Sequence, residues 1–228
     1  MTAISLSVRP NLFHCLVRGR TIFLDLESDR YFALPEDLDA SFRDVVSGAS
    51  FGFDDDEPLS RLIDLRILVE AADDTGTLSR SDITLAQTSL LDEVAGGPNI
   101  LRSTRAAIRQ LNVRAELKFG RLIDVVNRRR GIASTLRSTQ ADPDRTIYIA
   151  RIAVTDAIGM DQILSPHLRC LPRAIAMFDG MAAAGVAPSI VIGVNDTRFG
   201  AHCWLQIDDM VISDTVEGVC AYRPILVI

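Results

Sequence analysis

The chain has 228 residues and a formal net charge of −6, and 48% of its residues are hydrophobic, which is enough apolar material for a buried core. No run of eighteen or more apolar residues could span a bilayer, and the first twenty residues lack the uninterrupted apolar stretch of a signal peptide. Widely scattered cysteines favour free thiols in a reducing compartment over disulfides; they are Cys15, Cys170, Cys203 and Cys220. We therefore expect a globular protein of the cytoplasm that does not cross a membrane.

Charge is distributed unevenly along the chain. Residues 1–75 hold 7 Arg against 15 Asp and Glu, a net charge of −8, whereas residues 76–228 hold 17 Lys and Arg against 15 Asp and Glu, a net charge of +2. Between them the segment AADDTGTLSRSD is small, polar and turn-forming. We predict two units, residues 1–75 and 84–228, joined by a linker at 76–83.

The first unit is predicted to be a small α+β unit. In RTIFLDLESDRYFALP the apolar runs 21–24 and 31–34 flank a polar turn, which predicts a β-hairpin. EDLDASFRDVVSG has apolar residues at helical spacing, acidic residues in its first turn and a glycine, Gly48, where a helix would stop. EPLSRLIDLRILVE predicts a second helix that opens at Pro58 and gives way to a strand. This order of elements resembles a small winged helix.

Winged helices often bind DNA, but a unit with a net charge of −8 would be repelled by phosphates. We therefore predict no nucleic-acid binding. A hairpin with an open edge can instead accept an extended peptide as an added strand. The alternative is that the unit only packs against the rest of the chain.

Residues 84–160 are predicted to be helical, beginning with TLAQTSLLDEVAGG, which ends at a glycine pair. Arg102, Arg105 and Arg109 would lie on one helix face, and the run 128–130 would end a helix, where cations suit the helix dipole. The chain has 23 Arg and one Lys, so these arginines are explained by composition or by contact with the acidic first unit.

A further helix is predicted to begin near Pro172, because apolar residues follow at helical spacing and Gly185 supplies a stop. Cys170 would then stand at the helix N-terminus, where the dipole and the neighbouring Arg169 and Arg173 favour the nucleophilic thiolate. The alternative is a buried structural cysteine.

Two strands are predicted after this helix, in APSIVIGVN and AHCWLQIDDMVISDT. Side chains alternate along a strand, so His202 and Trp204 share one face and Cys203 points to the other. Cys170 is therefore the better partner for His202, and Asp214, expected on the paired strand after the Asp208–Asp209 turn, could orient the imidazole. Cys, His and Asp in this order suit a thiol protease or an acyltransferase. Whether Trp204 lines the site or the core is open.

A metal site is the competing interpretation. His167, Cys170, His202 and Cys203 offer nitrogen and sulfur ligands, but the adjacent His202 and Cys203 diverge and no C-x-x-C anchors the set. We therefore expect no metal. Gln162 is a further candidate, as a donor to a developing oxyanion.

The segments CLPRAIAMFDGMAAAGV, IVIGV and AHCWLQID with a following Asp resemble the transglutaminase-like leader peptidase of lasso peptide biosynthesis, the B protein of those clusters. The resemblance covers roughly residues 145–228, although the chain ends soon after the last strand, at AYRPILVI. It implies a papain-like α+β cysteine peptidase domain without a cofactor. The positions that match the catalytic residues are Cys170, His202 and Asp214.

The first 70 or so residues resemble the precursor-recognition element of the same family, and FLDLESDRYFALP is the part that matches. The resemblance implies that this unit binds the leader of a ribosomally made precursor, and that an ATP-dependent cyclase similar to asparagine synthetase is a partner. The residues we expect to contact the leader are Phe23, Leu24, Tyr31 and Phe32. A transglutaminase proper and a non-catalytic peptide-binding adaptor remain as alternatives.

Overall fold

The computed structural model describes residues 6–48, 57–70, 83–93, 97–138, 142–164, 170–195 and 199–228. The chain divides into two compact units, residues 1–81 and 82–228. Both mix helices and strands, as an α+β chain should. The predicted linker, 76–83, lies outside the described residues except for Ile83, so its boundaries stay a prediction. No helix in the described ranges combines the length and the apolarity that a bilayer crossing needs.

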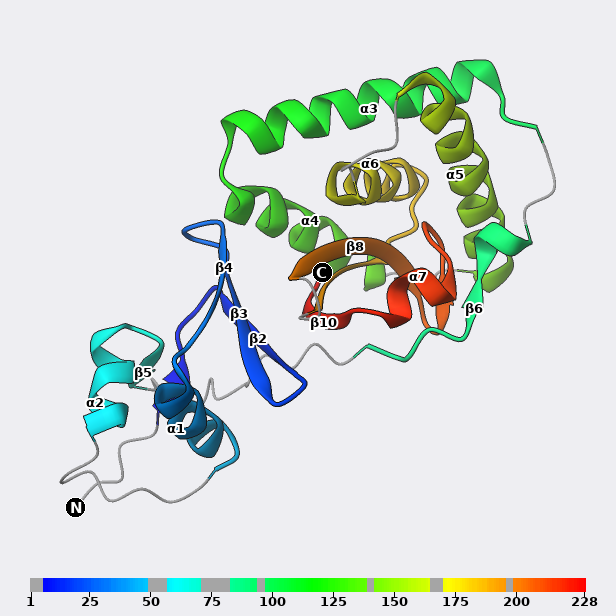
Figure 1. Ribbon diagram of the computed structural model, residues 1–228. Helices are drawn as coiled ribbons and strands as arrows, with labels where there is room; N and C mark the ends of the chain where they lie inside the picture. Colours follow the sequence, from blue (N-terminus) through cyan, green and yellow to red (C-terminus); the bar gives the residue numbers. More distant parts are fainter. Residues whose placement is uncertain are drawn as a thin grey trace. The chain divides into compact units, whose positions relative to one another are not determined.

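The first unit contains a three-stranded antiparallel sheet with β3 in the middle (Figure 1). Its strands are β2 (Leu12–Val17), β3 (Arg20–Asp25) and β4 (Arg30–Ala33). Two helices follow, α1 (Glu36–Val46) and α2 (Glu57–Asp64). Strands β1 (Leu6–Val8) and β5 (Leu68–Glu70) pair with each other in a separate two-stranded antiparallel sheet.

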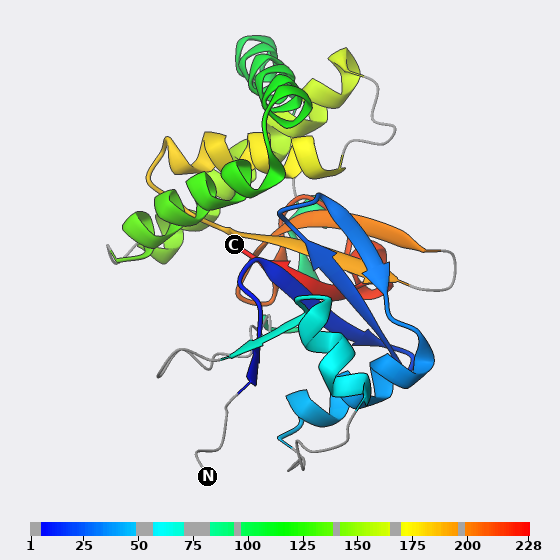
Figure 2. The ribbon, with the colours of Figure 1, turned by 90° about the vertical axis from the view of Figure 1, so that its left-hand side faces the viewer.

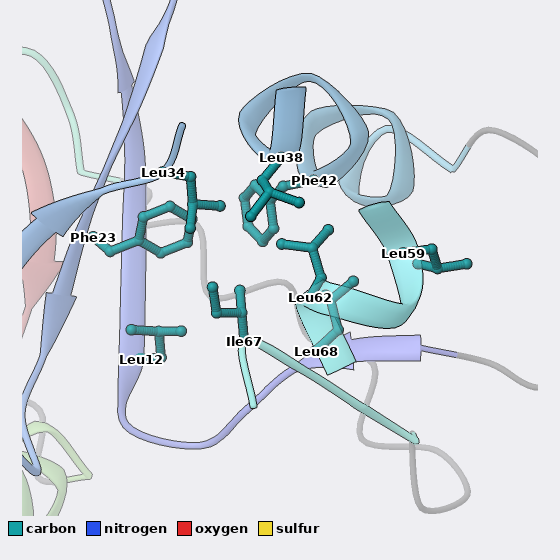
Figure 3. Packing of buried hydrophobic residues seen from close by; sticks show 9 residues of the cluster. All are labelled: Leu12, Phe23, Leu34, Leu38, Phe42, Leu59, Leu62, Ile67 and Leu68. Carbon is teal, nitrogen blue, oxygen red and sulfur yellow. The ribbon is translucent and has the colours of Figure 1, made fainter. Parts of the chain in front are cut away.

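The predicted hairpin, both predicted helices and the strand at 68–70 are confirmed, while β1 and β2 were not anticipated. Gly48 follows α1 with a φ of +80°, a conformation that suits glycine and explains why the helix stops there. The apolar faces of the sheet and both helices meet in one core, shown in Figure 3. Its buried members are Leu12, Phe23, Leu34, Leu38, Phe42, Leu59, Leu62, Ile67 and Leu68. The winged-helix likeness stays a prediction.

The second unit has a five-stranded sheet in the order β10-β7-β8-β9-β6, with a group of helices on one side (Figure 2). The strands are β6 (Thr88–Ser89), β7 (Ser189–Asn195), β8 (Gly200–Ile207), β9 (Met210–Val211) and β10 (Arg223–Val227). The helices are the 3-10 turn η1 (Leu90–Asp92), α3 (Ile100–Phe119), α4 (Leu122–Arg137), α5 (Pro143–Ile163), α6 (Cys170–Ala182) and α7 (Val216–Cys220). Helix α6 packs against β8 on one side and against α3 on the other (Figure 1).

The prediction of an α-helix in TLAQTSLLDEVAGG is wrong for the described residues of this segment, 84–93 and Gly97. Thr88 and Ser89 instead form β6, parallel to β9, and the backbone N–H of Gln87 donates to the Asp209 carbonyl at 2.8 Å. Leu90 is fully buried behind this strand. Pairing with the sheet edge outweighs the local helical preference here, because it buries Leu90 and satisfies the backbone at the same time.

The arginine run 128–130 does not end a helix, since α4 continues to Arg137. Arg129 is only 4% exposed and contacts Glu116 at 2.8 Å and Asp179 at 2.7 Å, which ties α4 to α3 and α6. Burial alone would lower the pKa of this guanidinium, but the hydrogen bonds that it donates to Asp179 and Glu116 raise the pKa above its ordinary value. Buried charge is tolerated here because both partners are within reach.

Helices α3 and α5 approach each other closely at Gly159. A β-carbon built there would lie 2.8 Å from the β-carbon of Ser103 and 2.6 Å from that of Pro98. Gly131, in the middle of α4, is exposed, and a β-carbon built on it would have no neighbouring atom within 4 Å. The two glycines therefore have opposite consequences for stability.

We predict that Gly131→Ala raises the free energy of unfolding by about 0.5–1 kcal/mol, because alanine loses less backbone entropy in a helix. Gly159→Ala should lower the free energy of unfolding by about 1–3 kcal/mol, because the added methyl group forces the two helices apart. Urea denaturation of the full-length variants, followed by circular dichroism, measures both. Equal effects of the two substitutions would contradict the close approach.

Candidate active site

Cys170 is the first residue of α6, so the predicted helix start is confirmed. The helix ends before Gly185, whose φ of +83° and backbone bond to the Ala182 carbonyl close the last turn as expected. The Cys170 side chain is partly buried, and the backbone N–H groups of Cys203 and Leu171 help to lower the pKa of its thiol. A thiol at this place faces the positive end of the helix dipole.

His202 lies on β8 opposite Gly193 of β7, and its Nε2 is 2.6 Å from Oδ2 of Asp214. The sequence predicts Asp214 on the strand that pairs with that of His202, and this is wrong. Asp214 lies three residues after β9 ends at Val211. It is fixed there by two contacts, the Ser89 hydroxyl donating to its carbonyl and the Thr215 N–H donating to Oδ1, both at 2.8 Å. The unanticipated strand β6 therefore helps to hold the carboxylate.

The His202 ring is near enough to the Cys170 thiol to lower its pKa, by hydrogen bonding and by charge. Because Nε2 faces Asp214, the remaining ring nitrogen, Nδ1, is the one that serves the thiol. The structure thus brings the three predicted side chains into one chain of contacts, Cys170 to His202 to Asp214.

Each group in this chain shifts the pKa of the next. The hydrogen bond that the ring donates to Asp214, followed by its hydrogen bond to Cys170, raises the pKa of His202 to about 9. Burial would raise the pKa of Cys170, but its hydrogen bond to His202 and the charge of that ring bring the pKa below its ordinary value. Burial of Asp214 is outweighed in the same way by His202 and the Thr215 N–H, so the pKa of the carboxyl is lowered. These directions favour a thiolate beside an imidazolium.

Cys203 does not share this environment. It is buried on β8, and burial raises the pKa of its thiol well above the ordinary value. Such a thiol is a poor nucleophile because it stays protonated. The face argument that separated Cys203 from His202 agrees with this placement.

Arg173, one helical turn after Cys170, has a different role from the one expected. Its guanidinium binds both carboxylate oxygens of Asp161 on α5, at 3.1–3.3 Å, and donates to the carbonyl of Ser213 at 2.6 Å. It therefore connects the helix that carries Cys170 to the segment that carries Asp214, and its charge helps to lower the pKa of Asp214. The shift at the Cys170 thiol comes from His202 instead. Arg169 lies outside the described residues.

Two aromatic side chains flank the His202 ring, Trp204 at 6.1 Å and Tyr222 at 5.1 Å between ring centroids. Trp204 is buried in a core cluster of the sheet, and its Nε1 donates to Oε1 of Gln206 at 3.0 Å. Trp204 therefore belongs to the core and also contacts the His202 ring. Gln206 in turn donates to the carbonyls of Thr84 and Asp208. Alternation along the strand places Gln206 on the same face as His202 and Trp204, which the contact between Trp204 and Gln206 confirms. Sequence reasoning did not identify Tyr222, because its position beside His202 depends on tertiary contacts.

The four residues expected to contact a leader peptide fall on the two faces of the β3–β4 hairpin. Phe23 pairs with Phe32, and their rings stack at 5.0 Å with Phe23 fully buried in the core. The Phe23 ring is enclosed in the core, and its contact with a peptide stays a prediction. Leu24 pairs with Tyr31 on the other face. Since β3 has partners on both sides, the edges that the described sheet leaves open belong to β2 and β4.

Among the described residues, no group of three or more His, Cys, Asp or Glu side chains is arranged to hold a metal ion. His167, one of the four ligands considered, lies outside them. Gln162 is exposed near the end of α5. Its suggested donor role stays a prediction.

Comparison with known proteins agrees with the geometry of the second unit. A family model, the transglutaminase-like superfamily, matches residues 110–227, which include Cys170, His202 and Asp214. No curated protein and no solved structure matches the chain. Domains of this superfamily fit cysteine peptidases or acyltransferases.

We predict that iodoacetamide alkylates Cys170 at pH values where an ordinary thiol is still protonated, because its pKa is lowered. Asp214→Asn removes the contact that does most to raise the pKa of His202, so the imidazolium is less favoured and the Cys170 profile should move to higher pH. Peptide mapping after alkylation at a series of pH values measures this. Buried Cys203 should stay unmodified, exposed Cys220 is the internal reference, and an unchanged profile in Asp214→Asn would contradict the relay.

Proposed function

Because the chain belongs to the transglutaminase-like superfamily, we propose that it is a cysteine peptidase that removes the leader from a ribosomally made precursor peptide during lasso peptide maturation. The observation that carries the proposal is the chain of contacts from Cys170 through His202 to Asp214. A nucleophile, a base and a group that orients the base are the parts that acyl transfer requires. The lasso assignment itself rests on the sequence resemblance of CLPR and AHCW.

In the proposed reaction the Cys170 thiolate attacks the carbonyl carbon of the scissile peptide bond. The tetrahedral intermediate collapses to a thioester on Cys170, and the leaving amine takes a proton from His202. Water then attacks the thioester, with His202 accepting the proton of the water, and the free carboxyl product leaves. Asp214 keeps the imidazole oriented and stabilises its charged form. Since the pKa of His202 is about 9, proton delivery should fail as the pH rises through that value.

The first unit is proposed to hold the leader as an added strand on the β2-β3-β4 sheet. We assign it to the edge of β4, the outer strand of the hairpin, where Tyr31 is partly exposed beside the open backbone. Main-chain hydrogen bonds would give affinity there, and side-chain contacts would give selectivity. A cyclase similar to asparagine synthetase, which uses ATP, is the proposed partner enzyme.

We predict that incubation with its precursor yields two fragments by mass spectrometry, that Cys170→Ala abolishes the product, and that Cys203→Ala retains it. The Cys170 change removes the nucleophile but little packing, whereas Cys203 takes no part in the relay. Circular dichroism of each variant controls for folding. A crosslinked product would indicate a transglutaminase, and an active Cys170→Ala variant would refute the peptidase proposal.

We also predict that the leader binds to a fragment of residues 1–81, which has its own hydrophobic core. Holding the leader raises its effective concentration at the catalytic unit, so residues 82–228 alone should cleave the precursor more slowly, by one or more orders of magnitude. Titration of the labelled leader with the folded fragment tests the first part. Full cleavage activity of residues 82–228 alone would overturn the role given to the first unit.

A further inference from the structure

A shallow groove lies where the C-terminal turns of α3 meet the first turn of α6. It is lined by Leu111, Arg114, Ala115, Lys118, Phe119 and Pro172. Phe119 is 82% exposed and Leu111 is 47% exposed, so two large apolar side chains face solvent side by side with two cations. Exposed apolar and cationic side chains gathered at one place are typical of a binding surface.

The groove lies at the end of α6 that carries the candidate nucleophile. Pro172 follows Cys170 by two residues, which is about 3 Å along a helix axis. The two helices run in opposite directions, since Arg109 lies beside Gly180 at one end and the turns around Lys118 lie beside Pro172 at the other. An extended peptide advances about 3.3 Å per residue. Two residues also turn a side chain by about 200° around the helix axis, so Pro172 faces the opposite side of α6 from Cys170. A substrate held at Cys170 could reach the groove by crossing the end of this helix, which is about 10 Å wide and takes about three or four extended residues.

The two cations of the groove are available for a ligand. Within the described residues, neither Arg114 nor Lys118 has an acidic partner, and the Lys118 ammonium lies 5.3 Å from the centre of the Phe119 ring. The neighbouring carboxylate, Glu116, is occupied by Arg128 and Arg129 at 2.9 Å and 2.8 Å. Uncompensated positive charge beside an apolar surface is complementary to an acidic side chain next to an apolar one.

We propose that this groove is a specificity subsite that binds an apolar side chain and an adjacent acidic side chain of the peptide substrate, a few residues from the scissile bond. The inference rests on the proposed peptidase function and adds the chemistry of the sequence that is recognised. Phe119 and Leu111 receive the apolar side chain. Arg114 and Lys118 receive the carboxylate.

The test measures binding separately from turnover. Full-length Cys170→Ala is titrated into fluorescein-labelled ten-residue peptides of Gly and Ser, in which one Phe-Glu pair is moved along the sequence, and the dissociation constants are read by fluorescence polarisation. Phe-Glu should bind about tenfold more tightly than Ala-Gln in at least one register, and salt should reduce the contribution of Glu. Phe119→Ala should remove the preference for Phe, and the pair Arg114→Gln with Lys118→Gln should remove the preference for Glu.

Two exposed residues at the other end of α3 provide matched controls. Leu101→Ala and Arg105→Ala remove the same kinds of side chain from the same helix but outside the groove, and should leave both preferences unchanged. The proposal is refuted if no register prefers Phe-Glu, if the groove variants keep the preference, or if the control variants lose it equally.

The wild-type enzyme is incubated with the same peptides to separate the two levels of the proposal. Groove-dependent binding without cleavage of any peptide would count against the peptidase function while leaving the subsite intact. Cleavage that does not depend on Phe119, Arg114 or Lys118 would support the peptidase and reject the subsite.

Discussion

The hydrogen bond of 2.6 Å between His202 and Asp214 determines the protonation of the whole site. It is the largest contribution to the raised pKa of His202, and the charged imidazole in turn lowers the pKa of the Cys170 thiol. Without the carboxylate the pKa of His202 would fall, and the ring would lower the pKa of the thiol less. The protonation of Cys170 therefore depends in part on a residue that it does not touch.

The group of Cys170, His202 and Asp214 requires three distant segments to meet. Cys170 comes from a helix end, His202 from the middle of the sheet, and Asp214 from an irregular segment after β9. Ser89, on the edge strand β6, holds the backbone of Asp214, and Gln206 fastens the chain near Thr84 to the same sheet. The start of the second unit is thus part of the support of the site, although it carries none of the three side chains.

The parts of the site that follow from periodicity could be predicted from the sequence. Spacing placed Cys170 at a helix start, and alternation along a strand put Cys203 on the face away from His202. The place of Asp214 could not be obtained in this way, because an irregular segment has no periodicity and is shaped by its contacts. The same limit explains the helix wrongly expected around Thr88, where pairing with β9 decided the structure.

The charge and hydrophobicity of a residue also do not predict which residues its side chain contacts in the folded protein. Phe23 is apolar in a hairpin, and only the fold shows that its ring is enclosed by Phe32 and Phe42. For the arginines of the second unit, the sequence left composition and contact with the acidic first unit as explanations. Two of them, Arg102 and Arg129, are satisfied by Asp156 and by Glu116 with Asp179 inside the unit.

The guanidinium of Arg173 has a mechanical consequence for a site assembled from separate layers. It is attached one turn beyond Cys170 and grips the carbonyl that immediately precedes Asp214, while Asp161 on α5 holds it from behind. One side chain therefore links the helix that begins at Cys170 to the backbone next to Asp214 and to α5. Loss of this guanidinium would remove a charged contact between all three segments at once.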